Sequence, residues 1–157
     1  MITDSQVFGK VSAIVPENVP LTSFSIVMAR YKGELDSQIK GFNALKGLRD
    51  GDRVLICEGC THHRQCNDIG TVKMPAWIEN YCKAKPAFSF TSGGTFPDDL
   101  REYKVIVHCG GCMLNEAEMK HRMAKAEEQG VPMVNYGLAI AAMHGILDRS
   151  LQVFKKD

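Results

Sequence analysis

The sequence lacks several features that would assign it to a common functional class. It has no apolar run of about 18 residues or more, so no segment is expected to span a membrane. It has no Lys/Arg run or basic stripe, and its 19 basic residues nearly balance 18 acidic ones, which argues against a nucleic-acid partner. No G-x-x-x-x-G-K-[ST] motif occurs, so a phosphate-cradling loop of that kind is excluded.

The beginning of the chain, MITDSQVFGK, lacks the basic start and the apolar core of a signal peptide. We therefore expect a cytoplasmic protein in a reducing compartment. In that setting the six cysteines indicate metal binding or redox chemistry rather than a disulfide framework. The hydrophobic content of 45% is enough for a buried core in one compact domain, or one domain with a small appendage.

The order of apolar patterns predicts an α/β fold. Helical spacing dominates the first 48 residues, in segments 7–15, 24–31 and 35–45. Short apolar runs predict strands at 53–57, 87–91, 104–108 and 132–135, and helices are expected from Pro75, from Asn115 to Gly130, and over 136–154. This alternation predicts an open, mainly parallel sheet flanked by helices. A seam at 48–52 divides the chain into predicted domains 1–50 and 51–157.

Two short stretches concentrate cysteine and histidine: CTHHRQC (60–66) and HCGGC (108–112). Cys60 lies three residues past one predicted strand, and Cys109 directly follows another. Because the carboxyl ends of parallel strands meet at one edge of a sheet, we expect Cys60, Cys109 and Cys112 to converge on one centre. Thiolates are the donors that zinc and iron–sulfur clusters prefer. The sequence therefore predicts a metal centre at this edge.

The glycines between the two later cysteines fit such a centre. Gly110 and Gly111 have no side chains, so their backbone N–H groups can approach a cluster closely. The helix that follows begins near Asn115, where Asn115 and Glu118 fit a capping box. Its positive end is directed at the same turn and favours negative charge there.

Four further residues are candidates for a fourth ligand. His62 and His108 flank the predicted thiolates, and each is a candidate for a role in the site. Cys66 and Asp68 are the other two, although Asp68 is more simply a helix cap. The two remaining cysteines are interpreted differently: Cys57 as a small core residue and Cys82 as a half-buried helix residue.

Residue chemistry leaves three kinds of site open. The first is an iron–sulfur cluster, and the second is a structural zinc with a Cys3His shell, formed by Cys60, His62, Cys109 and Cys112. The third is a thiol–disulfide oxidoreductase that uses the CxxC of Cys109 and Cys112. A dithiol enzyme has no use for a second Cys/His-rich loop at the same edge, which favours a metal.

The spacing Cys60-x-His62, then 45 residues, then His108-Cys109-x-x-Cys112 resembles the cluster-binding signature of the HydF family of FeFe-hydrogenase maturation proteins. The similarity extends well outside the motif and covers essentially the whole chain. The similar segments are TDSQVF (3–8), PLTSFSIVMARYKGEL (20–35), CTHHRQCNDIGTVKMPAWI (60–78), HCGGCMLN (108–115) and GVPMVNYGLAIAAMHGIL (130–147).

The resemblance implies both a domain content and a role. The chain corresponds to the end of the family's dimerisation domain followed by its cluster-binding domain, without the GTPase domain. Family members are scaffolds rather than enzymes in this part: they hold a 4Fe-4S cluster, accept the diiron precursor of the H-cluster and deliver it to the hydrogenase apoprotein. Their partners include two radical-SAM maturases, and a homodimer is expected.

The resemblance also assigns roles to single residues. Cys60, Cys109 and Cys112 would be the cluster thiolates. His62 and His108 occupy the family's histidine positions, at or near the exchangeable fourth iron. A fourth thiolate from Cys66 would close the iron that has to stay open for cargo.

Overall fold

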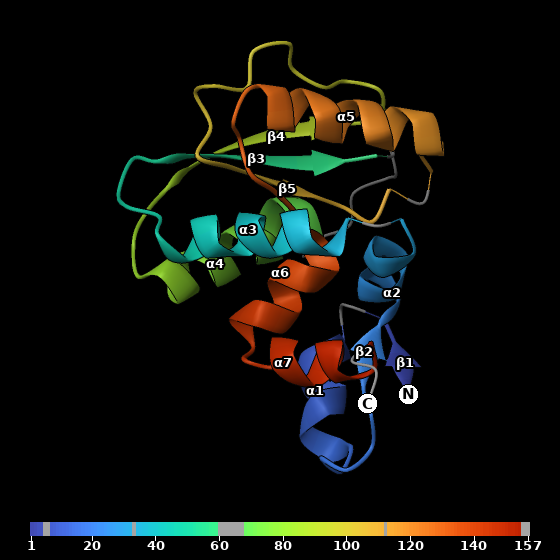
Figure 1. Ribbon diagram of the computed structural model, residues 1–157. Helices are drawn as coiled ribbons and strands as arrows, with labels where there is room; N and C mark the ends of the chain where they lie inside the picture. Colours follow the sequence, from blue (N-terminus) through green and yellow to red (C-terminus); the bar gives the residue numbers. More distant parts are fainter. Residues whose placement is uncertain (5–6, 33, 60–67, 112, 155–157) are drawn as a thin grey trace.

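The computed structural model describes residues 1–4, 7–32, 34–59, 68–111 and 113–154. Its centre is a four-stranded parallel sheet with the strand order β4-β3-β5-β6 (Figure 1). The strands are β3 (Arg53–Glu58), β4 (Ala87–Ser92), β5 (Val105–His108) and β6 (Met133–Asn135). Each strand lies where an apolar run predicts one, and the predicted α/β fold with an open parallel sheet is confirmed.

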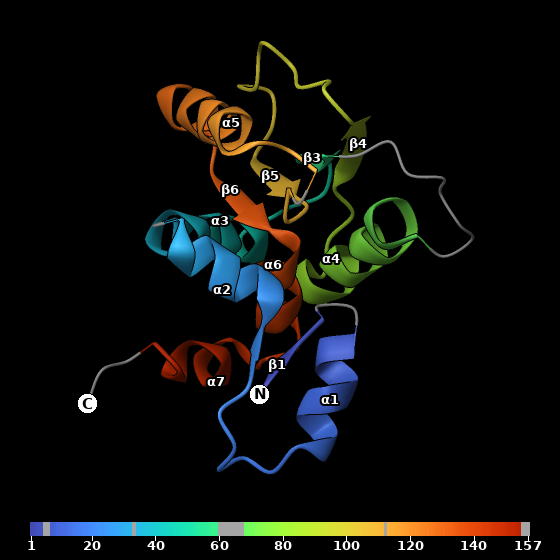
Figure 2. The same cartoon turned by 90° about the vertical axis from the view of Figure 1, so that its right-hand side faces the viewer.

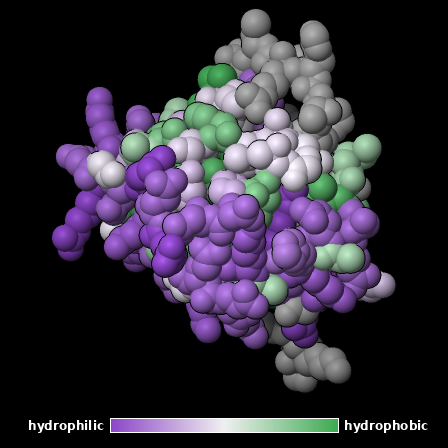
Figure 3. All heavy atoms as spheres, turned by 90° about the horizontal axis from the view of Figure 1, so that it is seen from above, coloured by the Kyte–Doolittle hydropathy of each residue, from purple (hydrophilic) through white to green (hydrophobic). Residues whose placement is uncertain are grey.

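The central strands are buried on both faces because their side chains alternate between two apolar clusters. Val54 and Ile56 of β3 belong to the cluster under α3 (Leu35–Lys46), α4 (Met74–Cys82) and α6 (Tyr136–Met143). Leu55 and Cys57 belong to the other cluster, which α5 (Glu116–Glu128) covers (Figures 1 and 2). Seen from the α5 side, the surface is mainly hydrophilic, as expected for an amphipathic covering helix (Figure 3).

The start of α5 agrees with its predicted cap only in part. Asn115 Oδ1 accepts a hydrogen bond from the Glu118 backbone N–H at 2.8 Å, which confirms Asn115 as the N-cap. The Glu118 carboxylate, however, accepts from Arg122 Nε at 2.7 Å instead of returning to the cap. The predicted capping box is therefore wrong in its second half, because a buried arginine one turn further along binds the carboxylate.

The predicted single closing helix over 136–154 is also wrong. The structure has two helices there, α6 and α7 (Leu147–Gln152), separated at Gly145. Gly145 adopts φ +71°, and Ile146 N–H donates to Ala141 O at 2.9 Å. A left-handed glycine with this hydrogen bond ends a helix. α6 is buried around almost its whole circumference, so it fills the space beneath the sheet.

The N-terminal elements lie below the sheet and beside α6 (Figure 1). They are β1 (Ile2–Thr3), α1 (Phe8–Ile14), β2 (Thr22–Ser23) and α2 (Phe24–Tyr31), with β1 and β2 paired in parallel. Arg149 of α7 joins the two ends of the chain, because its guanidinium donates to backbone carbonyls of Ser12, Val15, Pro16 and Val19. The mostly helical character predicted for this part is confirmed, whereas the division at residue 50 stays a prediction.

Within the described residues, no helix combines the length and the apolar character that crossing a bilayer requires.

Candidate metal centre

The sheet topology brings the two cysteine-rich stretches to one place. β3 and β5 are neighbours in the middle of the sheet, and Cys57 is paired with His108 at their carboxyl ends. From β3 the chain moves outward to β4 and then returns to the other side of β3 for β5 and β6. In open parallel sheets, ligands bind at the point where the strand order reverses in this way. The two stretches follow the two strands that flank this point.

A direct contact joins the beginning of the first stretch to the sulfur of the second. Gly59, the residue before Cys60, donates its backbone N–H to Cys109 Sγ at 3.0 Å. Cys109 N–H in turn donates to Cys57 O at 2.9 Å, as a continuation of the β3–β5 pairing. Cys109 is thus held at the carboxyl edge of the sheet, where the sequence predicts it.

The other predicted ligands of the first stretch lie outside the described residues. These are Cys60, His62 and Cys66. Cys112 of the second stretch also lies outside the described residues. Among the residues that the structure does describe, no three His, Cys, Asp or Glu side chains are placed to hold an ion. The convergence of Cys60 and Cys112 on Cys109 therefore stays a prediction.

The glycine turn after Cys109 is open to a cavity. Gly111 adopts φ +67°, and a Cβ atom there would lie 2.7 Å from Met119 Sδ, so a side chain would be strained and crowded. Gly110 and Gly111 line a cavity of about 540 Å³ together with Ile69, Leu114 and Tyr136. The turn therefore borders this cavity, while a contact of the two glycines with a cluster stays a prediction.

His108 is buried and contacts the backbone carbonyl of Cys109. Its side chain is only 1% exposed, with Nδ1 2.8 Å from Cys109 O and Nε2 3.1 Å from Arg122 Nη1. Arginine only donates, so Nε2 is the acceptor and Nδ1–H donates to the carbonyl oxygen. Burial lowers the pKa of His108 to about 4, so the imidazole is neutral at physiological pH. With both nitrogens engaged, His108 is better suited to supporting Cys109 than to being an exchangeable ligand.

Arg122 is the residue of this region that the sequence did not single out. It is fully buried on α5, where it donates to Glu118 Oε1 at 2.7 Å and to Gly93 O at 2.9 Å, besides its contact with His108. Its guanidinium also lies 5.0 Å from the centre of the Phe96 ring. The only available sequence signal was the four-residue spacing from Glu118, which is common on solvent-exposed helices.

Asp68 acts as a cap. Its Oδ2 accepts from Thr71 N–H at 3.0 Å and from Thr71 Oγ1–H at 3.1 Å, at the start of the π-helical turn η2 (Ile69–Lys73). This turn leads directly into α4. The simpler of the two interpretations of Asp68 is confirmed, and a role as fourth ligand stays a prediction.

Cys57 is a core residue, as expected. It is fully buried in the face of β3 that α5 covers, and Thr91 Oγ1–H donates to its sulfur at 3.2 Å. Burial raises the pKa of the Cys57 thiol to about 11. The thiol is therefore neutral and inaccessible in the folded protein. Cys82 is partly exposed near the end of α4.

We expect iodoacetamide at pH 8 to leave Cys57 unmodified in the folded protein and to modify Cys82. At that pH only about one Cys57 thiol in a thousand is ionised, and the thiolate is the reactive form. Peptide mass spectrometry after a timed reaction measures both sites, and the same reaction in urea is the control, where both sites should react. Equal rates at the two cysteines without urea would contradict the buried position of Cys57.

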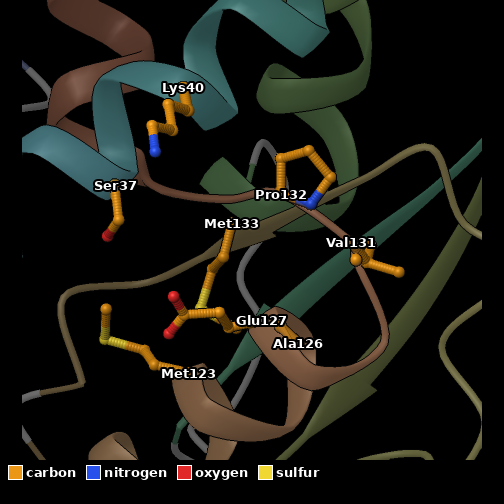
Figure 4. Close-up of a pocket in the computed structure, with 9 residues that line it drawn as sticks. Ser37, Lys40, Met123, Ala126, Glu127, Val131, Pro132 and Met133 are labelled. Carbon is orange, nitrogen blue, oxygen red and sulfur yellow. The ribbon is translucent and has the colours of Figure 1, made fainter.

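A second cavity lies away from the cysteines, at the amino end of β6. Its volume is about 230 Å³, and its walls come from α3, α5 and the segment that enters β6 (Figure 4). Lys40, Met123, Glu127 and Met133 are among its lining residues. No cysteine or histidine of the described chain lines it, so it offers none of the thiolate or imidazole donors of the predicted centre.

Comparison with known families gives two matches that together span most of the chain. Residues 1–33 match the hydrogen maturase F dimerization domain, and residues 36–153 match the hydrogen maturase F tetramerization domain. No curated protein matches the chain. The second match alone covers more than half of the sequence, and it includes both cysteine-rich stretches. The resemblance to this family is thereby confirmed, and the chain belongs to the hydrogen maturase F family, which acts in hydrogenase maturation.

Proposed function

We propose that this chain is a scaffold that holds a 4Fe-4S cluster through Cys60, Cys109 and Cys112 and leaves the fourth iron with an exchangeable ligand. Through that iron it accepts the diiron precursor of the FeFe-hydrogenase H-cluster and delivers it to the hydrogenase apoprotein. The observation that carries the proposal is the 3.0 Å contact between Gly59 N and Cys109 Sγ at the reversal point of the sheet. It supports a shared centre for the two stretches.

The described residues fit such a cluster. Cys109 is a soft donor, and a backbone N–H bond to its sulfur favours the thiolate form that iron binds. The turn at Gly110 and Gly111, which directly follows Cys109, lines a cavity of about 540 Å³. When bound, the cluster supplies an iron with a replaceable coordination position.

The protein groups around Cys109 have positioning roles in this proposal. His108 holds the Cys109 carbonyl through Nδ1–H, and Arg122 fixes the imidazole through Nε2. Hydrogen bonds to a ligand residue from groups that do not touch the metal commonly tune the orientation of that ligand and its affinity for the metal. On the open side, the cavity is lined by Met28 and Lys32 of the α2 region, which offer an apolar wall and a positive charge. The carboxylates of Asp4 and Glu116 line the same cavity.

Transfer of an intact diiron unit needs no bond-breaking step within the cargo, so we infer a carrier rather than an enzyme. The names of both matched domains indicate self-association. The two radical-SAM maturases and the hydrogenase apoprotein are the proposed partners, in the cytoplasm.

Replacement of Cys109 with serine is expected to abolish cluster binding. Anaerobically reconstituted wild-type protein should contain about four iron and four sulfide per chain and show the EPR signal of a reduced cubane, whereas Cys109→Ser should lose both. Cys82→Ser is the matched control, because Cys82 lies on α4, outside the predicted ligand set. Iron, sulfide and zinc are quantified on the same samples.

Two results would contradict the proposal in different ways. A colourless protein with about one zinc per chain, unfolded by a chelator, would indicate the structural zinc module. A metal-free protein that reduces disulfides, and loses this activity in Cys109→Ser, would indicate the oxidoreductase.

A further inference from the structure

The hydroxyl of Tyr136 is a buried donor that has no partner in the part of the chain that the structure describes. Tyr136 is the first residue of α6, directly after β6, and its side chain is 8% exposed. Its hydroxyl oxygen is inaccessible to solvent and has no hydrogen-bond partner among the described residues. Buried phenol O–H groups normally find a partner, because leaving one unpaired costs free energy. This hydroxyl therefore calls for an explanation.

At the edge of the sheet that carries Cys109, the backbone of Gly70 packs closely against the hydroxyl. A Cβ atom on Gly70 would lie 2.6 Å from the Tyr136 hydroxyl oxygen and 2.2 Å from Glu58 Oε1. The end of β3, the turn η2 and the start of α6 thus meet around this hydroxyl. Burial, followed by the negative charges of Glu58 and Cys109, raises the pKa of Tyr136 above its usual range. The phenol stays protonated and is available as a donor.

Tyr136 also lines the cavity next to the glycine turn. The same cavity of about 540 Å³ is bounded by Gly110 and Gly111, which directly follow Cys109. Much of the remaining wall is apolar and includes Met28, Ile69 and Ile140. We therefore expect the group that binds beside Gly110 and Gly111 to supply the acceptor for the phenol O–H.

We propose that Tyr136 is a positioning residue of the cluster site, whose phenol O–H donates a hydrogen bond to a sulfur atom of the cluster bound at Cys109. This inference rests on the proposed function. A donor to a cluster sulfur stabilises the more negative, reduced state and so raises the reduction potential. Tyr136→Phe keeps the ring and its packing but removes the donor.

The test compares two tyrosines of equal burial. Tyr103 is 9% exposed, like Tyr136, but it precedes β5 and so lies at the opposite end of that strand from Cys109. In an EPR-monitored redox titration of reconstituted protein, Tyr136→Phe should shift the midpoint potential to more negative values. Tyr103→Phe should leave it unchanged. Loss of iron from Tyr136→Phe, with full iron binding by Tyr103→Phe, would support the inference as well.

The iron-free protein provides the second measurement. Because the hydroxyl has no partner among the described residues, the thermal unfolding midpoint of iron-free Tyr136→Phe should equal or exceed that of the wild type. A lower midpoint would overturn the inference, since the hydroxyl would then have a partner within the protein. So would an unchanged potential in fully loaded Tyr136→Phe. A wild-type protein that binds no iron would instead overturn the proposed function, and this inference with it.

Discussion

Replacement of Arg122 with methionine is expected to lower the free energy of unfolding of the iron-free protein by about 3 kcal/mol. The fully buried guanidinium satisfies three groups from three parts of the chain: Glu118 Oε1, Gly93 O and His108 Nε2. Methionine fills part of the volume but leaves the last two acceptors buried without a donor. Glu118 is partly solvated, so it contributes less to the loss. Urea denaturation followed by circular dichroism measures the change.

A matched control lies on the same helix. Lys120 forms an ion pair with Glu116 at 2.6 Å with the same four-residue spacing, but both side chains are about two-thirds exposed, at 64% and 68%. Lys120→Met should therefore leave the free energy of unfolding nearly unchanged. Arg122→Lys should fall between the two, because a single ammonium cannot reach all three acceptors. Equal midpoints for Arg122→Met and Lys120→Met would show that the buried contacts contribute nothing.

The sheet and the position of Cys109 could be predicted because they depend on local patterns. Runs such as Val54–Cys57 are apolar throughout, as strands buried on both faces are, and this fixes the strands to within a residue or two. Cys109 follows directly from the topology, because parallel strands end at the same edge. The order of the strands was not predictable in the same way, since no short pattern encodes that β5 returns to lie beside β3.

The features that the sequence concealed depend on distant or competing partners. Arg122 lies in a strongly polar segment, so nothing local shows that it is buried against Gly93 and Phe96. Glu118 was assigned to the cap because Asn115 is three residues away, but the buried charge of Arg122 outweighs a backbone N–H as a partner. Gly145 is a residue type that often ends helices, so the sequence did indicate a break there. The apolar periodicity on both sides favoured one continuous helix, but the chain makes a left-handed turn at Gly145 instead.

The substitution Gly41→Ala is expected to lower the free energy of unfolding by about 3 kcal/mol, against the usual trend for glycine in helices. Helix propensity alone would favour alanine by about 1 kcal/mol. A Cβ atom on Gly41, however, would lie 2.3 Å from Met133 O and 2.9 Å from Val134 N. These are backbone atoms of β6, which cannot move without disturbing its pairing with β5. The clash therefore outweighs the gain in propensity.

Gly47→Ala, measured by the same urea denaturation, separates the clash from the general effect of removing a glycine. Gly47 ends α3 with φ −91°, and a Cβ atom there would meet nothing closer than 3.9 Å. This variant should be neutral or more stable by up to about 1 kcal/mol. Similar losses in both variants would mean that the close approach of α3 to β6 is not what makes Gly41 necessary.

The close approach at Gly41 also determines the geometry of the candidate site, so the same substitution should affect it. It places Gln38, one turn earlier on α3, where its Oε1 accepts from the Asn135 backbone N–H at 3.0 Å. The side chain of Asn135 caps α6 through Leu138 N–H at 2.7 Å, and α6 begins with Tyr136. Gly41→Ala that still folds should therefore bind less iron after reconstitution, whereas Gly47→Ala should bind as much as the wild type. Full iron binding by a destabilised Gly41→Ala would show that the spacing between α3 and β6 affects stability but not the site.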